Sequence, residues 1–335
     1  MKNKRSHAYY LLLFLLALLL LAIVFLFSLK WGAADLSFAD INRALFDFDR
    51  TNQAQQVFRT IRLPRVLGTA LVGASFAIAG AMMQGITRNP LADTGLLGIN
   101  AGAGLGLAVC FALLPHAGYF SILGASFIGA ALGVASIYAI AFSNPFASSP
   151  LRLILAGAGI SALFVALSQM ISLLFNLNRD LAFWTLGGTS VITWTQVAIL
   201  APTFVVLLLI SLTLGKAITL IHISEETAVN LGLNPSRTRV IVSLLVLGLA
   251  GVSVSIVGSI GFVGLMVPHI MSFFVGSDYR YILPFSAVGG AILLTAADLA
   301  ARMINPPFET PSGAVVALLG VPFFLLMARS REVAS

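Results

Sequence analysis

Charged residues at the ends of two apolar segments have the types and spacing needed to bind carboxylates. Arg62 and Arg65 stand three residues apart in the motif R-L-P-R, and Asp298 precedes Arg302 by four residues. Guanidinium groups bind carboxylates through two parallel hydrogen bonds. Residues four apart on a helix share one face, so Asp298 can pair with Arg302 in a supporting role. The three arginines therefore either receive acidic groups of a partner or lie at the level of solvent and lipid headgroups.

A second group of residues predicts a short helix in a polar stretch, at about residues 217–238. The segment from Ile223 reads I-S-E-E-T-A-V-N-L-G-L-N-P-S. Ser224 suits the N-cap position, and Glu225 and Glu226 suit the positive end of a helix. Gly232 together with Pro235 is expected to end it. The alternative interpretation of this segment is an ordinary surface loop.

A third motif, Asn89-Pro90-Leu91, follows Arg88 at the end of an apolar segment. Pro90 cannot donate a backbone hydrogen bond, and it restricts the conformation of the residue before it. The motif therefore ends a helix. From the residues alone, it is interpreted as an ordinary tight turn.

Missing motifs exclude several classes of function. There is no G-x-x-x-x-G-K-[ST] phosphate loop, so the chain is not itself an ATP-hydrolysing enzyme. No cluster of carboxylates or histidines lies within an apolar segment, which argues against a secondary transporter and against transport of a bare metal ion. The single cysteine, Cys110, excludes an intrachain disulfide, and His269 is interpreted as a packed residue. We expect no metal site and no cofactor.

Composition places the chain in a membrane. Of its 335 residues, 59% are hydrophobic and only 9% are charged, whereas an ordinary soluble domain has roughly a quarter of its residues charged. The net charge of +7 is explained by basic loops, which in membrane proteins concentrate on one side, and it does not indicate nucleic acid. The partner that composition implies is membrane lipid.

The apolar segments predict an all-α, polytopic bundle in a single transmembrane domain, residues 1–335. A helix needs about 20 apolar residues to cross the hydrocarbon core. About ten candidates occur, at 8–29, 63–86, 95–115, 118–142, 151–175, 197–215, 240–259, 260–275, 282–304 and 311–328. The eighth is short and contains Pro268, so we expect it to be tilted, broken or partly re-entrant. With ten crossings and a basic N-terminus, both termini are expected in the cytoplasm.

Small residues recur at four-residue spacing within these segments, which predicts close helix packing. They are Gly73, Ala77, Ala81 and Gly85; Gly98, Gly102 and Gly106; and Gly129 and Gly133. The stretch from Gly73 to Gly80 also resembles that from Gly251 to Gly258. This similarity leaves open whether the two halves form an inverted repeat.

Several motifs in a fixed order resemble the permease family that imports iron–siderophore complexes, haem and cobalamin through binding-protein-dependent ABC transporters. They are R-L-P-R, R-N-P-L-A-D at 88–93, G-S-I-G-F-V-G-L-M-V-P-H at 258–269, and E-T-P-S-G at 309–313. The resemblance extends from about residue 58 to the C-terminus. Thr94 and Ser272 depart from the family pattern, which usually has proline and a basic residue there.

The resemblance implies a function and a set of partners. The chain would be the permease subunit of an importer for ferric chelates in the bacterial cell membrane; haem or cobalamin import is the alternative within the family. Its partners would be two copies of an ATP-binding subunit, an extracytoplasmic substrate-binding protein, and a second permease chain, identical or homologous.

The resemblance also implies roles for individual residues. Arginines at the outer ends of the second and ninth spans would receive acidic residues of the binding protein, namely Arg62, Arg65 and Arg302, with Asp298 supporting them. The short inner helix would be the coupling helix that enters a cleft of the ATPase, through Ser224, Glu225, Glu226, Ala228, Leu231 and Gly232. Asn89, Pro90 and Leu91 would lie at the cytoplasmic gate.

Overall fold

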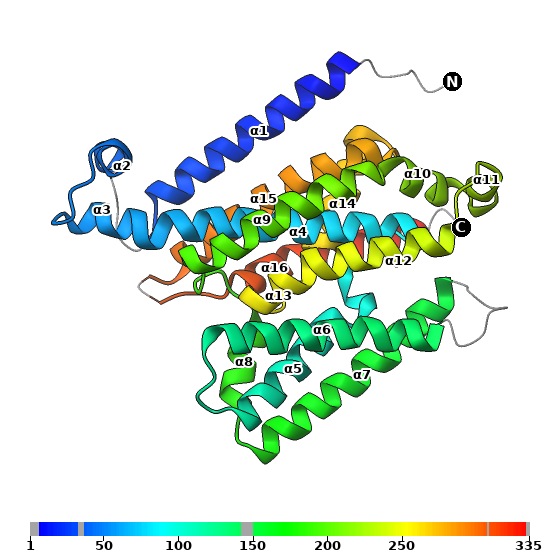
Figure 1. Ribbon diagram of the computed structural model, residues 1–335. Helices are drawn as coiled ribbons and strands as arrows, with labels where there is room; N and C mark the ends of the chain where they lie inside the picture. The colour runs from blue at the N-terminus through cyan, green and yellow to red at the C-terminus, as the bar shows by residue number, and fades with distance from the viewer. Residues whose placement is uncertain (1–6, 33–36, 142–149, 307, 333–335) are drawn as a thin grey trace.

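The structure is a computed structural model that describes residues 7–32, 37–141, 150–306 and 308–332, and all regular elements in these ranges are helical (Figure 1). The long or apolar helices are α1 (His7–Lys30), α4 (Leu63–Thr87), α5 (Ile99–Leu113), α6 (Tyr119–Ala141), α7 (Pro150–Leu174), α9 (Trp194–Thr213), α12 (Pro235–Val246), α13 (Val252–Val257), α14 (Val263–Val275), α15 (Tyr279–Ile304) and α16 (Ser312–Glu332). The all-α membrane bundle predicted from the sequence is confirmed.

The expected spans correspond closely to these helices. Seven helical stretches of the described chain are long and apolar enough to cross a membrane, and three shorter apolar helices join them. The last residue of the fourth expected span, Phe142, lies outside the described residues. Lipid offers no hydrogen-bonding partner to the backbone, so an apolar segment of this length satisfies its own amides as a helix.

Helices α5 and α14 are short because the backbone turns sharply just before each of them. Gly98, with φ of 66°, precedes α5, and Gly258 (φ 76°) and Phe262 (φ 66°) precede α14. The left-handed region suits glycine but is rare for a bulky residue such as phenylalanine. At 13 residues, α14 is about 20 Å long, which is too short to cross a hydrocarbon core of about 30 Å. The expectation of a short eighth span is therefore confirmed.

The centre of the bundle is the antiparallel pair α4 and α15, joined by α14 and α12. In the membrane-length window of α4, 83% of the residues are buried, against 6% in α1 and 11% in α7. A Cβ at Gly73 would lie 2.2 Å from the carbonyl oxygen of Gly290, and one at Gly80 would lie 2.0 Å from that of Gly264. The close packing predicted from the small-residue spacing is confirmed here, because no larger side chain fits between these backbones.

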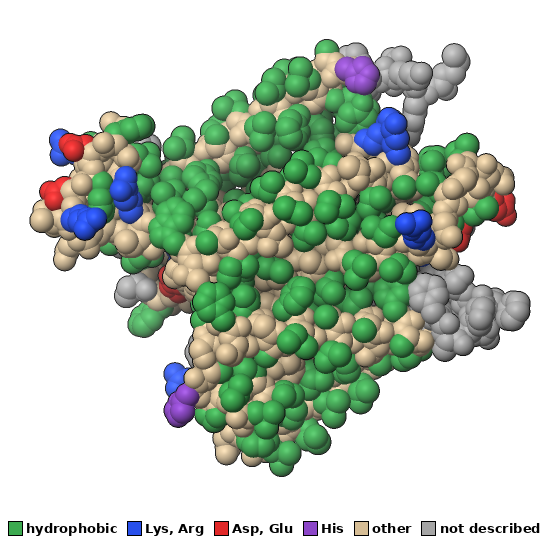
Figure 2. Space-filling model, in the orientation of Figure 1, with side chains coloured by type: hydrophobic (Ala, Val, Ile, Leu, Met, Phe, Trp, Pro, Cys, Tyr) green, Lys and Arg blue, Asp and Glu red, His purple; other side chains and the backbone are tan. Residues whose placement is uncertain are grey.

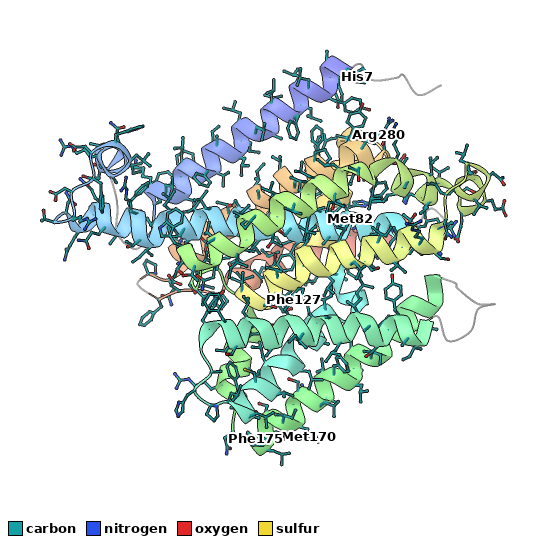
Figure 3. All side chains as sticks on the ribbon, viewed as in Figure 1. His7, Met82, Phe127, Met170, Phe175 and Arg280 are labelled. Carbon is teal, nitrogen blue, oxygen red and sulfur yellow. The ribbon has the colours of Figure 1, made fainter. Side chains whose placement is uncertain are left out.

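A second group of helices packs beside this centre. It consists of α5, α6, α7 and the short α8 (Asn178–Leu186), below α12 and α13 in Figure 1. Along α5 and α6 the contact again depends on glycine, since a Cβ at Gly102 would lie 2.2 Å from the carbonyl oxygen of Gly129. In Figure 3, Met82 lies in the middle of the molecule, whereas Met170 and Phe175 lie at the edge formed by α7.

The polar stretches form short helices at the two ends of the bundle. At one end lie α2 (Phe38–Phe46), α3 (Gln53–Val57) and the π-helix η1 (Phe58–Arg62). At the other lie α10 (Gly215–Ile223) and α11 (Glu225–Asn230). A second π-helix, η3 (Leu247–Gly251), joins α12 to α13, and a 3-10 turn, η2 (Thr94–Leu97), precedes α5. Figure 2 shows charged side chains gathered at these ends, with a mainly hydrophobic surface between them. We call the two ends the arginine end and the α11 end.

The start of α1 and the end of α16 lie at the same end of the bundle (Figure 1). The start of α1 lies at the α11 end, where Tyr10 stacks on Tyr281 near the start of α15 with ring centroids 4.1 Å apart. Figure 3 likewise shows His7 and Arg280 toward that end. Helix α16 starts at the arginine end, where Thr189 donates a hydrogen bond to Ser312, and runs back toward the α11 end.

Candidate docking surface and coupling helix

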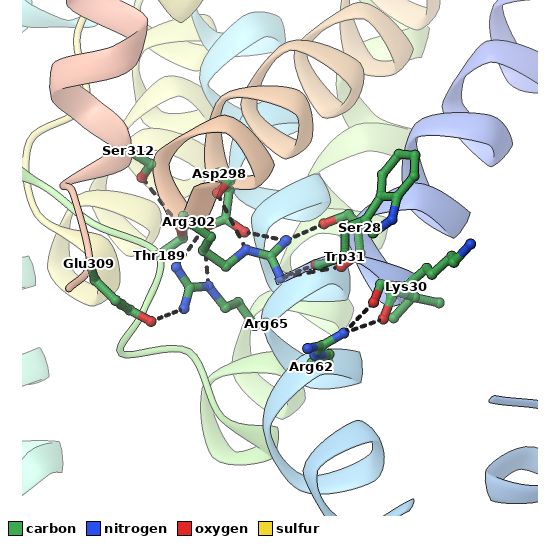
Figure 4. Close-up of polar contacts among 11 residues, drawn as sticks. Ser28, Lys30, Trp31, Arg62, Arg65, Thr189, Asp298, Arg302, Glu309 and Ser312 are labelled. Atoms are coloured by element: carbon green, nitrogen blue, oxygen red, sulfur yellow. Dashed lines mark hydrogen bonds and ion pairs between the residues drawn. The ribbon is translucent and has the colours of Figure 1, made fainter. Parts of the chain in front are cut away.

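The three predicted docking arginines converge at the arginine end because α4 and α15 are antiparallel. Arg62 closes the π-helix η1, and Arg65 follows Pro64 in the first turn of α4. Arg302 lies in the last turn of α15. The side chains meet between these helices and the end of α1 (Figure 4).

Asp298 is the centre of this cluster. Its side chain is fully buried, and Nε and Nη2 of Arg65 donate to Oδ1 at 3.0 and 2.9 Å. The hydroxyl of Thr189 donates to the same oxygen at 2.5 Å. Nη2 of Arg302 lies 3.1 Å from Oδ2, an ion-pair distance without the alignment of a hydrogen bond. The predicted pairing of Asp298 with Arg302 along the helix is confirmed.

Arg62 and Arg302 also hold the C-terminal end of α1. Nη1 of Arg62 donates to the carbonyl oxygens of Leu29 and Lys30 at 3.0 and 2.6 Å. Nη1 of Arg302 donates to the carbonyl oxygen of Ser28 at 3.2 Å. The last carbonyls of a helix have no partner within it and form its negative end, so cations are favoured there. These two arginines therefore join α1 to the bundle.

Glu309 is a cluster member to which the sequence analysis gave no role. Its Oε1 accepts a hydrogen bond from Nη1 of Arg65 at 2.6 Å, and its side chain is 49% exposed. Three arginines against two carboxylates leave the cluster a net charge of +1. The sequence placed Glu309 in the motif E-T-P-S-G at the start of an apolar segment. It does not show which basic residue this carboxylate contacts.

The structure differs from the expectation of arginines at exposed helix ends. Arg62, Arg65 and Arg302 are only 5%, 6% and 7% exposed, because the carboxylates and helix carbonyls of the chain already surround them. Beside Arg65 and Glu309 lies a cavity of about 430 Å³, which Trp184 and Thr189 also line. Arg65 and Glu309 therefore border open space on this side.

At the α11 end, the predicted short helix is confirmed. Ser224 is the N-cap of α11, and its hydroxyl accepts a hydrogen bond from the amide of Thr227 at 3.3 Å. Gly232, with φ of 82°, ends the helix: its amide donates to Val229 and the amide of Leu233 to Ala228. This pair of bonds is a Schellman motif. The prediction that Pro235 also ends α11 is wrong. Pro235 is the first residue of α12 and follows its N-cap, Asn234.

An ion pair ties α11 to the centre of the bundle. Nη1 and Nη2 of Arg239 donate to the two oxygens of Glu225 at 3.2 and 2.8 Å. Arg239 is 4% exposed, and its Nε donates to the carbonyl oxygen of Ile86 near the end of α4. Arg88 lies 3.8 Å from the same carboxylate. A displacement of α11 would therefore act on α4 and α12 together.

The helix preceding α11 is also held against α4. Burial lowers the pKa of the His222 imidazole in α10; a hydrogen bond to the backbone of Gly85 raises it, and the charge of Arg88 lowers it. Glu226, in contrast to Glu225, is exposed, as are Leu231 and Gly232, while Ala228 is buried. Glu225 and Ala228 thus face the chain's own bundle, and the other residues face away from it.

The Asn89-Pro90-Leu91 segment forms a tight turn. Asn89 Oδ1 accepts from the amide of Leu91 at 3.0 Å, and the Asn89 carbonyl accepts from the amide of Ala92. The turn follows Arg88, whose φ of 53° ends α4. It directs the chain back into the bundle, where Asp93 packs closely against Gly264 of α14. A Cβ at Gly264 would lie 2.7 Å from Oδ1 of Asp93. The predicted helix end is confirmed, and the gate role stays a prediction.

Comparison with known proteins identifies the family. Residues 20–330 match the model of the FecCD transport family. The chain belongs to this family. It is 40% identical over 326 residues to the Fe(3+)-citrate import system permease protein YfmD of Bacillus subtilis, covering 97% of each chain. It is 39% identical to the iron(3+)-hydroxamate import system permease protein FhuB of the same organism, covering 90% of this chain and 79% of FhuB.

A solved structure agrees with this assignment. An inward-facing conformation of a metal-chelate type ABC transporter aligns with a TM-score of 0.84 and 28% identity, over 95% of this chain and 99% of that one. The chain is therefore a transporter component without an ATPase domain of its own, as the missing phosphate loop indicated.

Proposed function

We propose that this chain is the permease subunit of an ABC importer that carries ferric chelates across a bacterial cell membrane. The observation that carries the proposal is similarity over almost the whole chain to permeases named for ferric citrate and ferric hydroxamate. The bundle suits the task. Its charged residues gather at the two ends, and the described surface between them is largely apolar.

The arginine end would receive the binding protein. The cluster has a net positive charge, and Arg65 lines the open cavity together with Glu309. Guanidinium forks bind carboxylates bidentately, and complementary charge speeds encounter and fixes the docked orientation. In this arrangement an acidic residue of the binding protein displaces Glu309 from Arg65, while Arg62, Arg302 and Asp298 hold the platform together.

The α11 end would receive the ATPase and thus lie in the cytoplasm, with both chain termini. The exposed residues Glu226, Leu231 and Gly232 offer the outer face of α11, and Ser224 and Ala228 set its position. The Glu225–Arg239 pair transmits its movement to α4 and α12. The nearby turn at Asn89, Pro90 and Leu91 is well placed to close the inner mouth, with a second permease chain completing the path.

Haem or cobalamin import is the alternative within the family. Relatives named for hemin transport in Yersinia pestis and for cobalamin import in Halobacterium salinarum are each 36% identical to the chain. We favour ferric chelates because the relatives at 40% and 39% identity are named for ferric citrate and ferric hydroxamate.

The proposal is tested with the complete transporter, meaning the permease, its ATPase and its binding protein, reconstituted in vesicles. Uptake of ⁵⁵Fe supplied as a ferric chelate should require ATP and the binding protein, and unlabelled haem or cobalamin should not compete. ATP-driven uptake of haem or cobalamin by these vesicles, without uptake of ⁵⁵Fe, would replace the proposed substrate.

Docking is tested by Arg65→Lys, which keeps the positive charge but removes the planar guanidinium that binds a carboxylate through two hydrogen bonds. Stimulation of ATPase activity by the binding protein should fall about tenfold, since one bidentate contact is worth roughly 1.5–3 kcal/mol. Arg50→Lys, at an exposed position of the same end, is the matched control. Equal stimulation in both variants would remove Arg65 from the docking surface.

A further inference from the structure

A cavity of about 600 Å³ lies along one side of the bundle, between α1 and α9. Phe14 and Leu21 of α1 form one wall, Phe204 and Leu208 of α9 form the other, and α4 and α15 form the floor. We call this cavity the α1 groove. Every described residue that lines it is apolar. It belongs to the apolar surface between the two charged ends, so it faces hydrocarbon when the bundle spans a membrane.

The α1 groove exists because small side chains form much of its floor. Ala70 and Ala74 of α4 and Ala291 of α15 face it. Helix α1 does not fill the space above them, because it packs on α15, where the ring centroids of Phe14 and Phe285 are 5.2 Å apart. The walls of an empty apolar hollow lose the dispersion contacts that a filling molecule would supply. A molecule that fills the groove therefore stabilises the bundle.

The dimensions of the α1 groove suit one lipid chain. Along α9 it extends from Val197 to Leu212, which corresponds to roughly 22 Å of helix. One leaflet supplies about 15 Å of hydrocarbon, half of a core of about 30 Å, so an acyl chain fits lengthwise. A helix of the same length and about 10 Å across would occupy roughly 1,700 Å³. A partner helix could therefore cover the groove but could not enter it.

A lysine stands at the α11 end of the α1 groove. Lys216 lies four residues beyond the last groove residue of α9, is exposed, and forms no ion pair with any described residue. On the facing helix, Arg280 lies four residues before Pro284, and a Cβ at Gly215 would lie 3.1 Å from the Cα of Arg280. Arg280 is paired with Asp278, so Lys216 leaves this end of the groove with a net positive charge. Basic residues at a membrane surface attract the headgroups of anionic lipids.

We propose that the α1 groove binds an anionic phospholipid, with one acyl chain along the groove and the phosphate at Lys216. With the α11 end in the cytoplasm, as proposed above, this headgroup lies in the leaflet whose surface is negative. The lipid fills the space that α1 leaves above α4 and so holds α1 against the bundle. Its binding involves neither the cargo nor the ATPase, so the tests below do not depend on the proposed function.

The first test measures the thermal midpoint of the delipidated full-length permease in detergent. It compares added dioleoylphosphatidylglycerol, which is anionic, with dioleoylphosphatidylcholine, which has no net charge. At about a hundredfold excess over its dissociation constant, phosphatidylglycerol should raise the midpoint by about 5 °C. It should also bind about fivefold more tightly than phosphatidylcholine. No shift with either lipid would overturn the site, and equal affinities would overturn the anionic headgroup.

The second test places the headgroup. Lys216→Gln should remove the preference for phosphatidylglycerol, because no unpaired cation then remains at the groove. Arg237→Gln, which removes a charge from an exposed position of the same end, is the matched control and should keep the preference. An unchanged preference in Lys216→Gln would overturn the placement of the phosphate. Glycerol phosphate alone should give no shift, and a shift equal to that of the lipid would show a free phosphate site and overturn the lipid assignment.

The third test fills the groove. Ala201→Phe and Ala70→Phe introduce a ring from α9 and from α4 at half-buried positions of its lining. The shift caused by phosphatidylglycerol should fall to about a fifth of its wild-type size, because the ring competes with the lipid for the same space. The midpoint without lipid should stay or rise, which distinguishes a filled groove from a damaged fold.

The matched control for groove filling is Val206→Phe, at an exposed position on the opposite face of α9. It should keep the full response to phosphatidylglycerol. The two groove variants enlarge side chains on different helices, so one that fails to fold does not remove the other. A full lipid response in a folded groove variant would overturn the proposal.

Discussion

Replacing Asp298 by asparagine should loosen the arginine end far more than its small change in shape suggests. The carboxylate is fully buried and lies 2.9 Å from one guanidinium and 3.1 Å from another. Asparagine keeps the volume but removes the charge, so the cluster passes from a net +1 to +2. Removing one member of a buried ion pair costs about 3–5 kcal/mol. We expect the lower value, about 3 kcal/mol, because helix carbonyls and Glu309 still bind the arginines.

The assay is thermal unfolding of the purified chain in detergent. At roughly 2 °C per kcal/mol for a chain of this size, the midpoint should fall by about 6 °C. Asp47→Asn, at an exposed position of the same end, should not shift it. In the double variant Asp298→Asn with Arg302→Gln, the loss should be smaller than the sum of the single losses, by about 0.5–3 kcal/mol. An unchanged midpoint for Asp298→Asn, or strict additivity, would refute the ion-pair reasoning.

Three further outcomes follow from the packing and the charges. Glu225→Gln should lower the thermal midpoint and the ratio of uptake to ATP hydrolysis, because it breaks the ion pair to α12; Glu226→Gln, exposed and one residue away, should leave the midpoint unchanged. Gly73→Ala should cost about 1–3 kcal/mol through overpacking, since its Cβ would lie 2.2 Å from a backbone oxygen, whereas Gly124→Ala should cost nothing measurable. Asp93→Asn should keep uptake within twofold of wild type, and proton-driven transport that depends on this carboxylate would contradict the ATP-driven scheme.

The sequence predicted those features that depend on local pattern. Run length and hydropathy located the spans, because lipid leaves the backbone few alternatives to a helix. The capping preference of serine predicted the start of α11 at Ser224, and four-residue spacing predicted the Asp298–Arg302 pair. Small residues at the same spacing predicted close packing at Gly73 and Gly80.

Features that depend on distant contacts could not be predicted from one sequence. Arg65 meets Glu309 across 244 positions, and Thr189 meets Asp298 across 109. Nothing local indicates either choice, nor that the arginines would be buried. The π-helix that ends at Arg62 and the short helices α2, α3 and α8 were missed for a related reason. Their sequences have no apolar run, and tertiary packing decides their form.

The most direct test of the account separates the two sources of energy for uptake. Vesicles containing the permease, its ATPase and the binding protein should accumulate ferric chelate in the presence of a protonophore. They should lose all uptake when the phosphate-loop lysine of the ATPase is replaced. Accumulation that survives the ATPase substitution but is lost with the protonophore would contradict the claim that a separate ATPase subunit supplies the energy for transport through this chain.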